Sequence, residues 1–161
     1  MAITDKLTAI ANAIRSKTGT TNTMTLDEMS NAITNIQTGT ITSDNRCTTI
    51  SDYLFYGCTN LSLTELPSGL TSIGGYAFYN CTKLALTELP SGLTSIGAHA
   101  FGNCLGIHSL TFKGTPNIIK PDAFIGCIYL TTINVPWAEG AVENAPWSAS
   151  NATINYNYVA V

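Results

Sequence analysis

The chain has 161 residues, a length that suits one domain with a small appendage. Its formal net charge is −3, and only 11% of its side chains are charged. Its seven Lys and Arg residues are scattered, so the sequence lacks the basic cluster that nucleic-acid-binding proteins carry. No apolar run is long enough to cross a bilayer, so we expect no membrane insertion. Thr, Ser and Asn must supply most of the polar surface, and these residues suit turns and strand faces.

Residues 1–37 predict two short amphipathic helices. The second begins with a capping box, in which Thr25 is the N-cap residue and Glu28 is N3, and its apolar face continues to residue 36. Helices this short do not form a stable core alone. We expect them to join copies of the chain or to attach it to a larger assembly; the alternative is a cap over the repeats that follow. The apolar face of the first helix consists of Ile3, Leu7, Ile10 and Ile14.

Residues 38–136 form an array of repeats with a period of 23 residues. Two blocks, at 63–74 and 86–97, are identical and read LTELPSGLTSIG. A fixed period of this length predicts a solenoid, in which stacked repeats build one continuous core. Four columns keep the period: Cys58, Cys81, Cys104 and Cys127; Phe55, Phe78, Phe101 and Phe124; Ile50, Ile73, Ile96 and Ile119; and Leu61, Leu84, Ile107 and Leu130.

Each repeat is expected to contribute one short strand, followed by a turn and a short helical or irregular segment that carries the Phe and Cys columns. Proline follows three of the expected strands and ends them, because it has no backbone N–H for the ladder. The predicted fold class is therefore α+β, a solenoid with an N-terminal helical element and a C-terminal cap. The strands are expected near residues 64–66, 87–89, 110–112 and 133–135, with a first strand around Ile41.

Residues 137–161 depart from the period and predict the C-terminal cap. A terminal repeat needs a cover over its open core, and Trp137 and Trp147 can provide one. Residues 152–159 alternate between apolar and polar side chains, as a strand does. The predicted organisation is thus a two-helix element over 1–37, leucine-rich repeats over 38–136 and a cap over 137–161.

The five cysteines predict a core position rather than a disulfide framework. An odd number at a regular spacing argues against paired cysteines. Free Cys behaves as a small buried hydrophobe, so the whole Cys column is expected to be reduced and buried. Cys47 occupies the offset of Leu70 and Leu93 in the next two repeats, which favours the same interpretation.

Residues 47–136 resemble the leucine-rich repeats of the BspA-like, or treponema-type, family. The turn of that family runs roughly I-G-x-x-A-F-x-x-C-x-x-L, and it appears here at residues 73–84 and, as far as the Cys, at 96–104. Thr64 and Thr87 stand where the family has an inward aliphatic residue, so the strands there are expected to shift or loosen. The resemblance implies a non-enzymatic binding or structural module.

The two ends of the chain are similar to tail and structural proteins of Firmicutes phages and prophages. The similar segments are 10–33, which contains NAIRSKTGT and LDEMSNAI, and 135–156. This resemblance implies a virion-tail protein that contacts a host surface ligand, either a protein or a cell-surface glycan. It also implies assembly as a trimer through residues 1–37.

The alternative function is a bacterial cell-surface module of the BspA-like kind, active in adhesion or protein interaction. The N-terminus lacks the basic start and continuous apolar stretch of a secretory signal, which counts against this alternative. The chain is then expected to be made in the cytoplasm, or to reach the outside by another route.

No group of residues in the sequence predicts catalysis, a metal or a cofactor. His99 and His108 lie at repeat offsets occupied by very different residues, so they are expected to face solvent without a catalytic partner. A zinc site built from these histidines and Cys104 would need four convergent ligands, whereas the Cys column faces the core. Glu139 and Glu143 fit a solvated loop better than a pair of catalytic carboxylates.

Two surface columns are candidate binding sites. On the strand face, one line consists of Glu65, Glu88, Thr111 and Asn134, and the alternative is that exposed strand positions are simply polar. On the turn side, a cluster consists of Tyr53, Tyr56, Tyr76 and Tyr79. Tyrosine favours interfaces because it joins apolar area to a polar tip. The alternative is that these rings only cover the backbone of neighbouring repeats.

Overall fold

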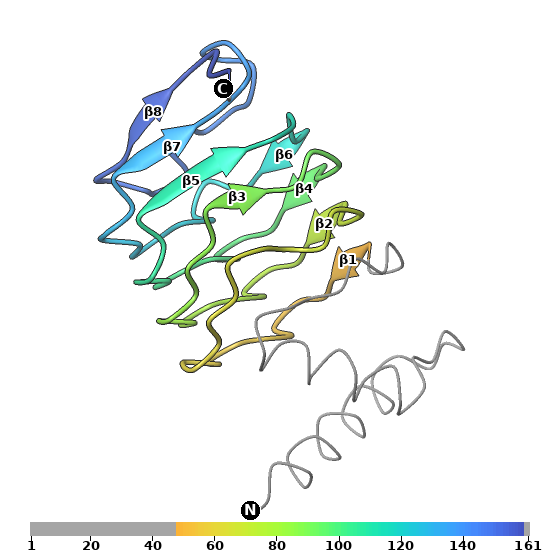
Figure 1. The fold of residues 1–161 in the computed structure, drawn as a ribbon, viewed down its shortest axis with the longest axis vertical. Coiled ribbons are helices and arrows are strands. Elements are labelled where there is room, and N and C mark those ends of the chain that lie inside the picture. The colour runs from red at the N-terminus through yellow and green to blue at the C-terminus, as the bar shows by residue number, and fades with distance from the viewer. Residues whose placement is uncertain (1–47, 160–161) are drawn as a thin grey trace, which may run out of the picture. The chain divides into compact units, whose positions relative to one another are not determined.

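The computed structural model describes residues 48–159, which form a β-solenoid in which each turn of chain, here called a rung, adds one layer (Figure 1). These residues contain eight strands and no helix, so the predicted α+β class is wrong for the described part of the chain. In the same part, no helix could span a membrane. The helices expected over 3–14 and 26–36, and the first strand expected around Ile41, lie outside the described residues.

Tight turns, and not helical segments, carry the Phe and Cys columns. The backbone N–H of Phe78 donates to the carbonyl of Ala100 at 2.8 Å, and that of Phe101 donates to Ala123 at 2.9 Å. Each bond joins a rung to the next one along the chain. A helix would need the same N–H groups for carbonyls four residues earlier, so bonding between rungs excludes it.

Sheet A lies along one side of the solenoid and consists of β1 (Thr49–Ile50), β2 (Ser72–Ile73), β4 (Ser95–Ile96) and β6 (Ile118–Ile119). The strands are parallel, in the order β1-β2-β4-β6 (Figure 1). Their register places each Ile of the column opposite the next, 23 residues on, which confirms the period. The sequence interpretation expected one strand per repeat and missed this sheet, because two-residue strands have no visible alternation.

Sheet B consists of β3 (Glu88–Leu89), β5 (Ser109–Phe112), β7 (Thr132–Asn134) and β8 (Thr153–Asn155). These strands are also parallel and follow the order β3-β5-β7-β8. They overlap three of the four strands expected in the repeats, and β8 lies within the strand expected over 152–159. The strand expected at 64–66 is absent. Thr64 and Thr87 are both exposed, but Leu66 is only partly buried, whereas Leu89 at the same offset in β3 is fully buried, so the segment at 64–66 packs less closely on the core.

The core runs between the two sheets, and stacked phenylalanines form its centre. The rings of Phe78, Phe101 and Phe124 are fully buried, and neighbouring centroids lie 5.3–5.4 Å apart. At the C-terminal end, Trp147 is also fully buried, and its carbonyl accepts a hydrogen bond from the N–H of Phe124 at 3.0 Å. Trp147 therefore covers the end of the phenylalanine column, where the next rung would lie.

Three cysteines of the column are buried free thiols, as predicted, and one is not. The Sγ atoms of Cys81, Cys104 and Cys127 donate to carbonyls of the preceding rung at 2.9–3.2 Å. Burial raises the pKa of Cys81 to about 12 and that of Cys127 to about 11, and it also raises the pKa of Cys104. Cys58 is exposed, so its predicted burial is wrong. It belongs to the first described rung; Cys47 lies outside the described residues.

Candidate binding surface

Five aromatic side chains stack along the turn side of the solenoid, in two rows that we call the aromatic ladder. The first row contains Tyr53, Tyr76 and His99, with centroid distances of 5.0 and 4.6 Å and ring planes within 6° of parallel. The second row contains Tyr56 and Tyr79, 5.3 Å apart and 8° from parallel. All four tyrosines predicted to cluster are therefore brought together, and the structure adds His99.

The first row arises from a repeated left-handed turn. Tyr53, Tyr76 and His99 have φ angles of 59°, 55° and 56°, a region that L-residues other than glycine rarely adopt. Hydrogen bonds between rungs hold this conformation: the N–H of Tyr53 donates to Gly75 at 3.0 Å, and that of Tyr76 donates to Ala98 at 2.9 Å. Since the same turn recurs at the strand spacing of ~4.8 Å, each ring lies on the face of the next.

The rings cover each other between rungs, whereas no second ring among residues 48–159 stacks on the outer face of Tyr53 or Tyr56. Rings of different rows are tilted by 48–51°, with centroids 5.5–6.4 Å apart. Tyr53 is 58% exposed and Tyr56 is 52% exposed, whereas Tyr76 and Tyr79 are partly buried. The hydroxyl of Tyr79 accepts a hydrogen bond from Nδ2 of Asn103 at 3.1 Å. Within residues 48–159, the other three ladder hydroxyls have no hydrogen-bond partner.

Asp122 lies beside His99 at the C-terminal end of the first row. Nδ1 of His99 lies 2.9 Å from Oδ2 of Asp122, at ion-pair distance but without the alignment of a hydrogen bond. Both side chains are partly buried, so the expectation that His99 faces solvent is wrong in part. Its imidazole packs on Tyr76 and serves as the last ring of the row. His108 is exposed, as expected, and stacks on Tyr129 with a centroid distance of 5.9 Å.

The strand-face line is aligned only in part, and its polar groups bond to each other. The sheet register places Glu88 opposite Thr111, and Thr111 opposite Asn134. Nδ2 of Asn134 donates to Oγ1 of Thr111 at 3.1 Å, and Nδ2 of Asn155 donates to Oδ1 of Asn134 at 2.8 Å. Asn134 is 91% buried. Glu65, the remaining member of the line, lies in no strand.

An ion pair involves Glu88, the first member of this line that lies in a strand. The carboxylate of Glu88 pairs with the ammonium group of Lys113, and both side chains are about half exposed. Sequence reasoning missed Asn155 because it lies 21 residues after Asn134, outside the 23-residue period. It missed His99 as a ladder residue, although His99 occupies the same offset as Tyr53 and Tyr76.

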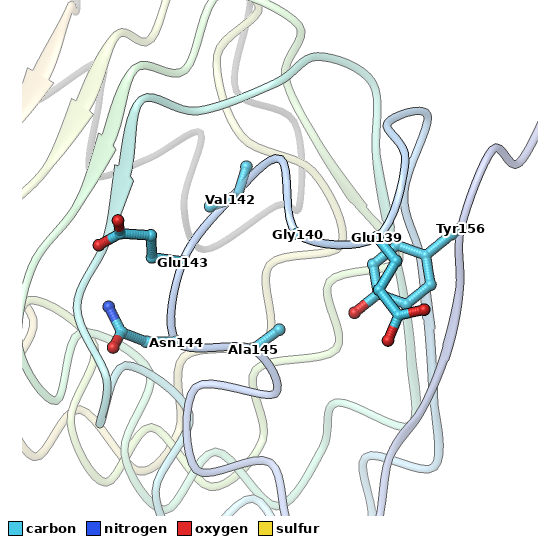
Figure 2. Close-up of a pocket in the computed structure, with 7 residues that line it drawn as sticks. All are labelled: Glu139, Gly140, Val142, Glu143, Asn144, Ala145 and Tyr156. Atoms are coloured by element: carbon cyan, nitrogen blue, oxygen red, sulfur yellow. The ribbon is translucent and has the colours of Figure 1, made fainter.

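A shallow pocket of about 490 Å³ lies beside the C-terminal loop. Figure 2 shows Glu143 and Asn144 on one side of it and Glu139 with Tyr156 on the other. Both glutamates are exposed, and the lining contains neither a histidine nor a cysteine. Across residues 48–159, no group of three or more His, Cys, Asp or Glu side chains could hold a metal ion.

The repeated rungs, the two short parallel sheets and the columns of Leu, Ile and Phe define a leucine-rich-repeat solenoid. Residues 28–152 match the family described as "BspA type Leucine rich repeat region", in six copies. The chain belongs to this family. The match confirms the resemblance of the repeats, whereas the resemblance of the chain ends to phage-tail proteins receives no support.

A solved structure shows the same fold. The crystal structure of a leucine-rich repeat protein from Bacteroides ovatus is similar to this chain, with a TM-score of 0.56 and 24% sequence identity. The similarity covers 68% of this chain and 28% of that protein, so the chain spans less than a third of the length of its structural relative. No curated protein matches the chain.

Proposed function

We propose that this chain is a non-enzymatic protein-interaction module of a bacterial surface protein, and that the aromatic ladder is its contact surface. Leucine-rich repeats of the BspA type are typically interaction modules, and proteins that carry them are typically found at the bacterial surface. This assignment agrees with the alternative expected from the sequence better than with a phage-tail protein. No feature of residues 48–159 favours the phage-tail role over the surface role.

The observation that carries the proposal is the exposure of Tyr53 and Tyr56 at one end of the ladder. Both tyrosines expose more than half of their surface, and Leu54 between them is 38% exposed. Tyrosine is enriched at protein interfaces, where it contributes apolar area and a hydroxyl at a low cost in conformational entropy. This cluster therefore has the composition of an interface core.

The strand-face line supports a binding role less well. Asn134 is buried and bonded on both sides, and Glu88 is paired with Lys113. A partner that binds there must break these contacts, and the cost of breaking them offsets part of the favourable free energy of binding. We retain Glu65 and Thr111 as residues that a large partner could reach, but they are not the proposed contact.

A protein partner fits the ladder better than a glycan does. Sugar rings typically stack on open aromatic faces, whereas both faces of Tyr76 and one face each of Tyr53 and Tyr56 are covered by stacked rings. The edges and hydroxyls that remain suit the mixed polar and apolar surface of a protein. Joining of several chains through residues 1–37, as in a trimer, remains a proposal, and it would multiply ladder contacts and raise avidity.

Site-specific photo-crosslinking on whole cells tests this function. A photo-activated residue replaces Tyr56 in one full-length variant and Tyr129 in a control, since Tyr129 is equally exposed (53%) but lies outside the ladder. Both variants are irradiated with cells of the bacterium that encodes the chain. We expect a protein adduct from position 56 only, which disappears when Tyr53→Ala is added or when the cells are first treated with protease. Equal adducts from both positions, or none from position 56, would contradict the proposal.

A further inference from the structure

We infer that the aromatic ladder recognises a proline-rich segment in the polyproline II conformation, flanked by basic residues. This inference rests on the proposed function and names the chemistry of its partner. It depends on three features of the ladder: its free hydroxyl donors, the distance between its rungs and the carboxylates at its ends. Aromatic side chains also line the grooves of several domains that bind polyproline II helices.

The free hydroxyls of Tyr53, Tyr56 and Tyr76 match a partner that is rich in acceptors. Within residues 48–159, none of the three has a hydrogen-bond partner. A polyproline II helix has no internal hydrogen bonds, so its carbonyl groups are free to accept. Proline also contributes no competing backbone N–H. In an α-helix, in contrast, the carbonyl groups already accept hydrogen bonds within the helix, so few acceptors are left for these hydroxyls.

The rung spacing matches the polyproline II repeat. Adjacent rings of the first row are separated by 5.0 and 4.6 Å, close to the ~4.8 Å between neighbouring strands. One turn of a polyproline II helix is three residues and rises about 9.3 Å, which is close to two rungs. Residues i and i+3 of such a helix would thus lie at the levels of Tyr53 and His99. Side chains on one face of an extended β-strand repeat every ~6.6 Å, a spacing that matches neither one rung (~4.8 Å) nor two.

Carboxylates at both ends of the first row favour basic flanking residues. Asp52 is exposed directly before Tyr53, and its Oδ1 accepts a hydrogen bond from the N–H of Gly75 at 2.7 Å. At the other end, Asp122 lies beside His99 with a third of its side chain exposed. Arg or Lys residues on either side of the proline segment would meet these charges. Such exposed charge pairs would orient the partner and raise its association rate more than they raise its affinity.

Isothermal titration calorimetry of the full-length chain with a designed peptide tests the inference. The probe contains about ten prolines between two arginines, because an uninterrupted proline run adopts the polyproline II helix. The control peptide has the same length and the same arginines, with Gly and Ser in place of proline. We expect saturable binding of the proline peptide and binding of the control at least about tenfold weaker, because a flexible chain must be ordered on binding.

Two variants separate the hydroxyls from the rings. The triple variant Tyr53→Phe, Tyr56→Phe, Tyr76→Phe keeps the stacked rings and removes the donors, so we expect it to bind the proline peptide about tenfold more weakly. Tyr129→Phe is the control, and it should bind as the parent does. Circular dichroism and melting temperature of each variant establish that the fold is retained.

Several outcomes would overturn the inference. These are no binding of the proline peptide, equal binding of the Gly/Ser peptide, or unchanged binding by the triple Phe variant. If the proline peptide fails while position 56 still forms a ladder-dependent protein adduct on cells, the partner chemistry is wrong and the proposed function stands. If the adduct is also missing, the proposed function fails with it.

Discussion

The ring of Tyr79 lies against Gly102, at the place where a side chain on Gly102 would be. A Cβ atom on Gly102 would come within 2.6 Å of Cδ2 and 2.8 Å of Cε2 of this ring. Gly102 occupies the same repeat offset as Tyr56 and Tyr79, so it ends the second row of the ladder and also makes room for its last ring. The absence of a side chain at this position therefore helps to set the geometry of the candidate binding surface.

Replacing Gly102 with alanine is expected to displace the ring of Tyr79. The new methyl group would overlap the ring, and the hydrogen bond between Asn103 and the Tyr79 hydroxyl would weaken. Overpacking of this kind costs about 1–3 kcal/mol. Urea denaturation and the NMR shifts of the tyrosine rings measure the effect.

Gly92→Ala is the matched control for this substitution. A Cβ atom there would meet its nearest neighbour, the carbonyl oxygen of Leu70, at 3.6 Å, which is ordinary contact. We expect Gly92→Ala to change stability by less than about 1 kcal/mol. A Gly102→Ala variant that is as stable as Gly92→Ala, with unshifted tyrosine resonances, would show that Tyr79 does not pack as described.

Truncation of the phenylalanine column should be most costly at its centre. Phe101 is fully buried between Phe78 and Phe124, so Phe101→Ala is expected to cost about 3–5 kcal/mol. Phe55 is only partly buried, and Phe55→Ala should cost clearly less. Chemical denaturation of both variants gives the comparison, and similar costs would mean that burial does not rise along the column as the structure has it.

Thiol reactivity should distinguish Cys58 from the other described cysteines. In a Cys47→Ser background, we expect one thiol to react rapidly with a chromogenic disulfide reagent and three to react only as the protein unfolds, because Cys81, Cys104 and Cys127 are buried. Adding Cys58→Ser should remove the fast phase alone. Two or more fast thiols in the folded protein, or fewer than four after non-reducing denaturation, would be incompatible with this arrangement.

Stability should fall at alkaline pH because of the buried thiols. An unfolded cysteine loses its proton near pH 8.5, whereas burial raises the pKa of Cys127 to about 11 and that of Cys81 to about 12. Between these values the unfolded chain binds fewer protons than the folded chain, so the free energy of unfolding decreases as pH rises. Below about pH 8 both states are protonated and the effect vanishes.

Unfolding free energies measured between pH 8 and pH 11 test this dependence. Tyrosine also titrates in this range, so the slope is compared with that of Cys81→Ala and Cys127→Ala. Each alanine variant should show a shallower decrease than the parent, whatever its stability at pH 7. Identical slopes in all three proteins would show that these thiols do not lose protons on unfolding.

The core was predictable from the sequence because a fixed period makes equivalent residues face the same way. Phe78, Phe101 and the Ile column are buried as expected, and the strands near 88, 110 and 133 form where the pattern places them. The α+β class was wrong because apolar spacing alone does not show whether a connecting segment bonds within itself or to the next rung. The amides of these segments bond between rungs.

The four tyrosines of the candidate site were predictable, but its fifth ring, His99, and its geometry were not. The tyrosine column was readable from the period, whereas the covered faces, the free hydroxyls and the packing of His99 depend on a left-handed turn with no sequence signature. On the strand face, the repeat offsets did not indicate that Asn134 is buried and hydrogen-bonded to both Thr111 and Asn155.

The sequence by itself determined the 23-residue period, the columns that supply most of the core and the family, since all three follow from which residue types recur at one offset. Only the tertiary structure decided that residues 48–159 form two sheets, that Cys58 is exposed and that five of their rings form a ladder. Each of these depends on contacts between rungs, where a carbonyl or a ring of one repeat meets the next. Such contacts depend on backbone dihedral angles, and a list of recurring residues does not specify those angles.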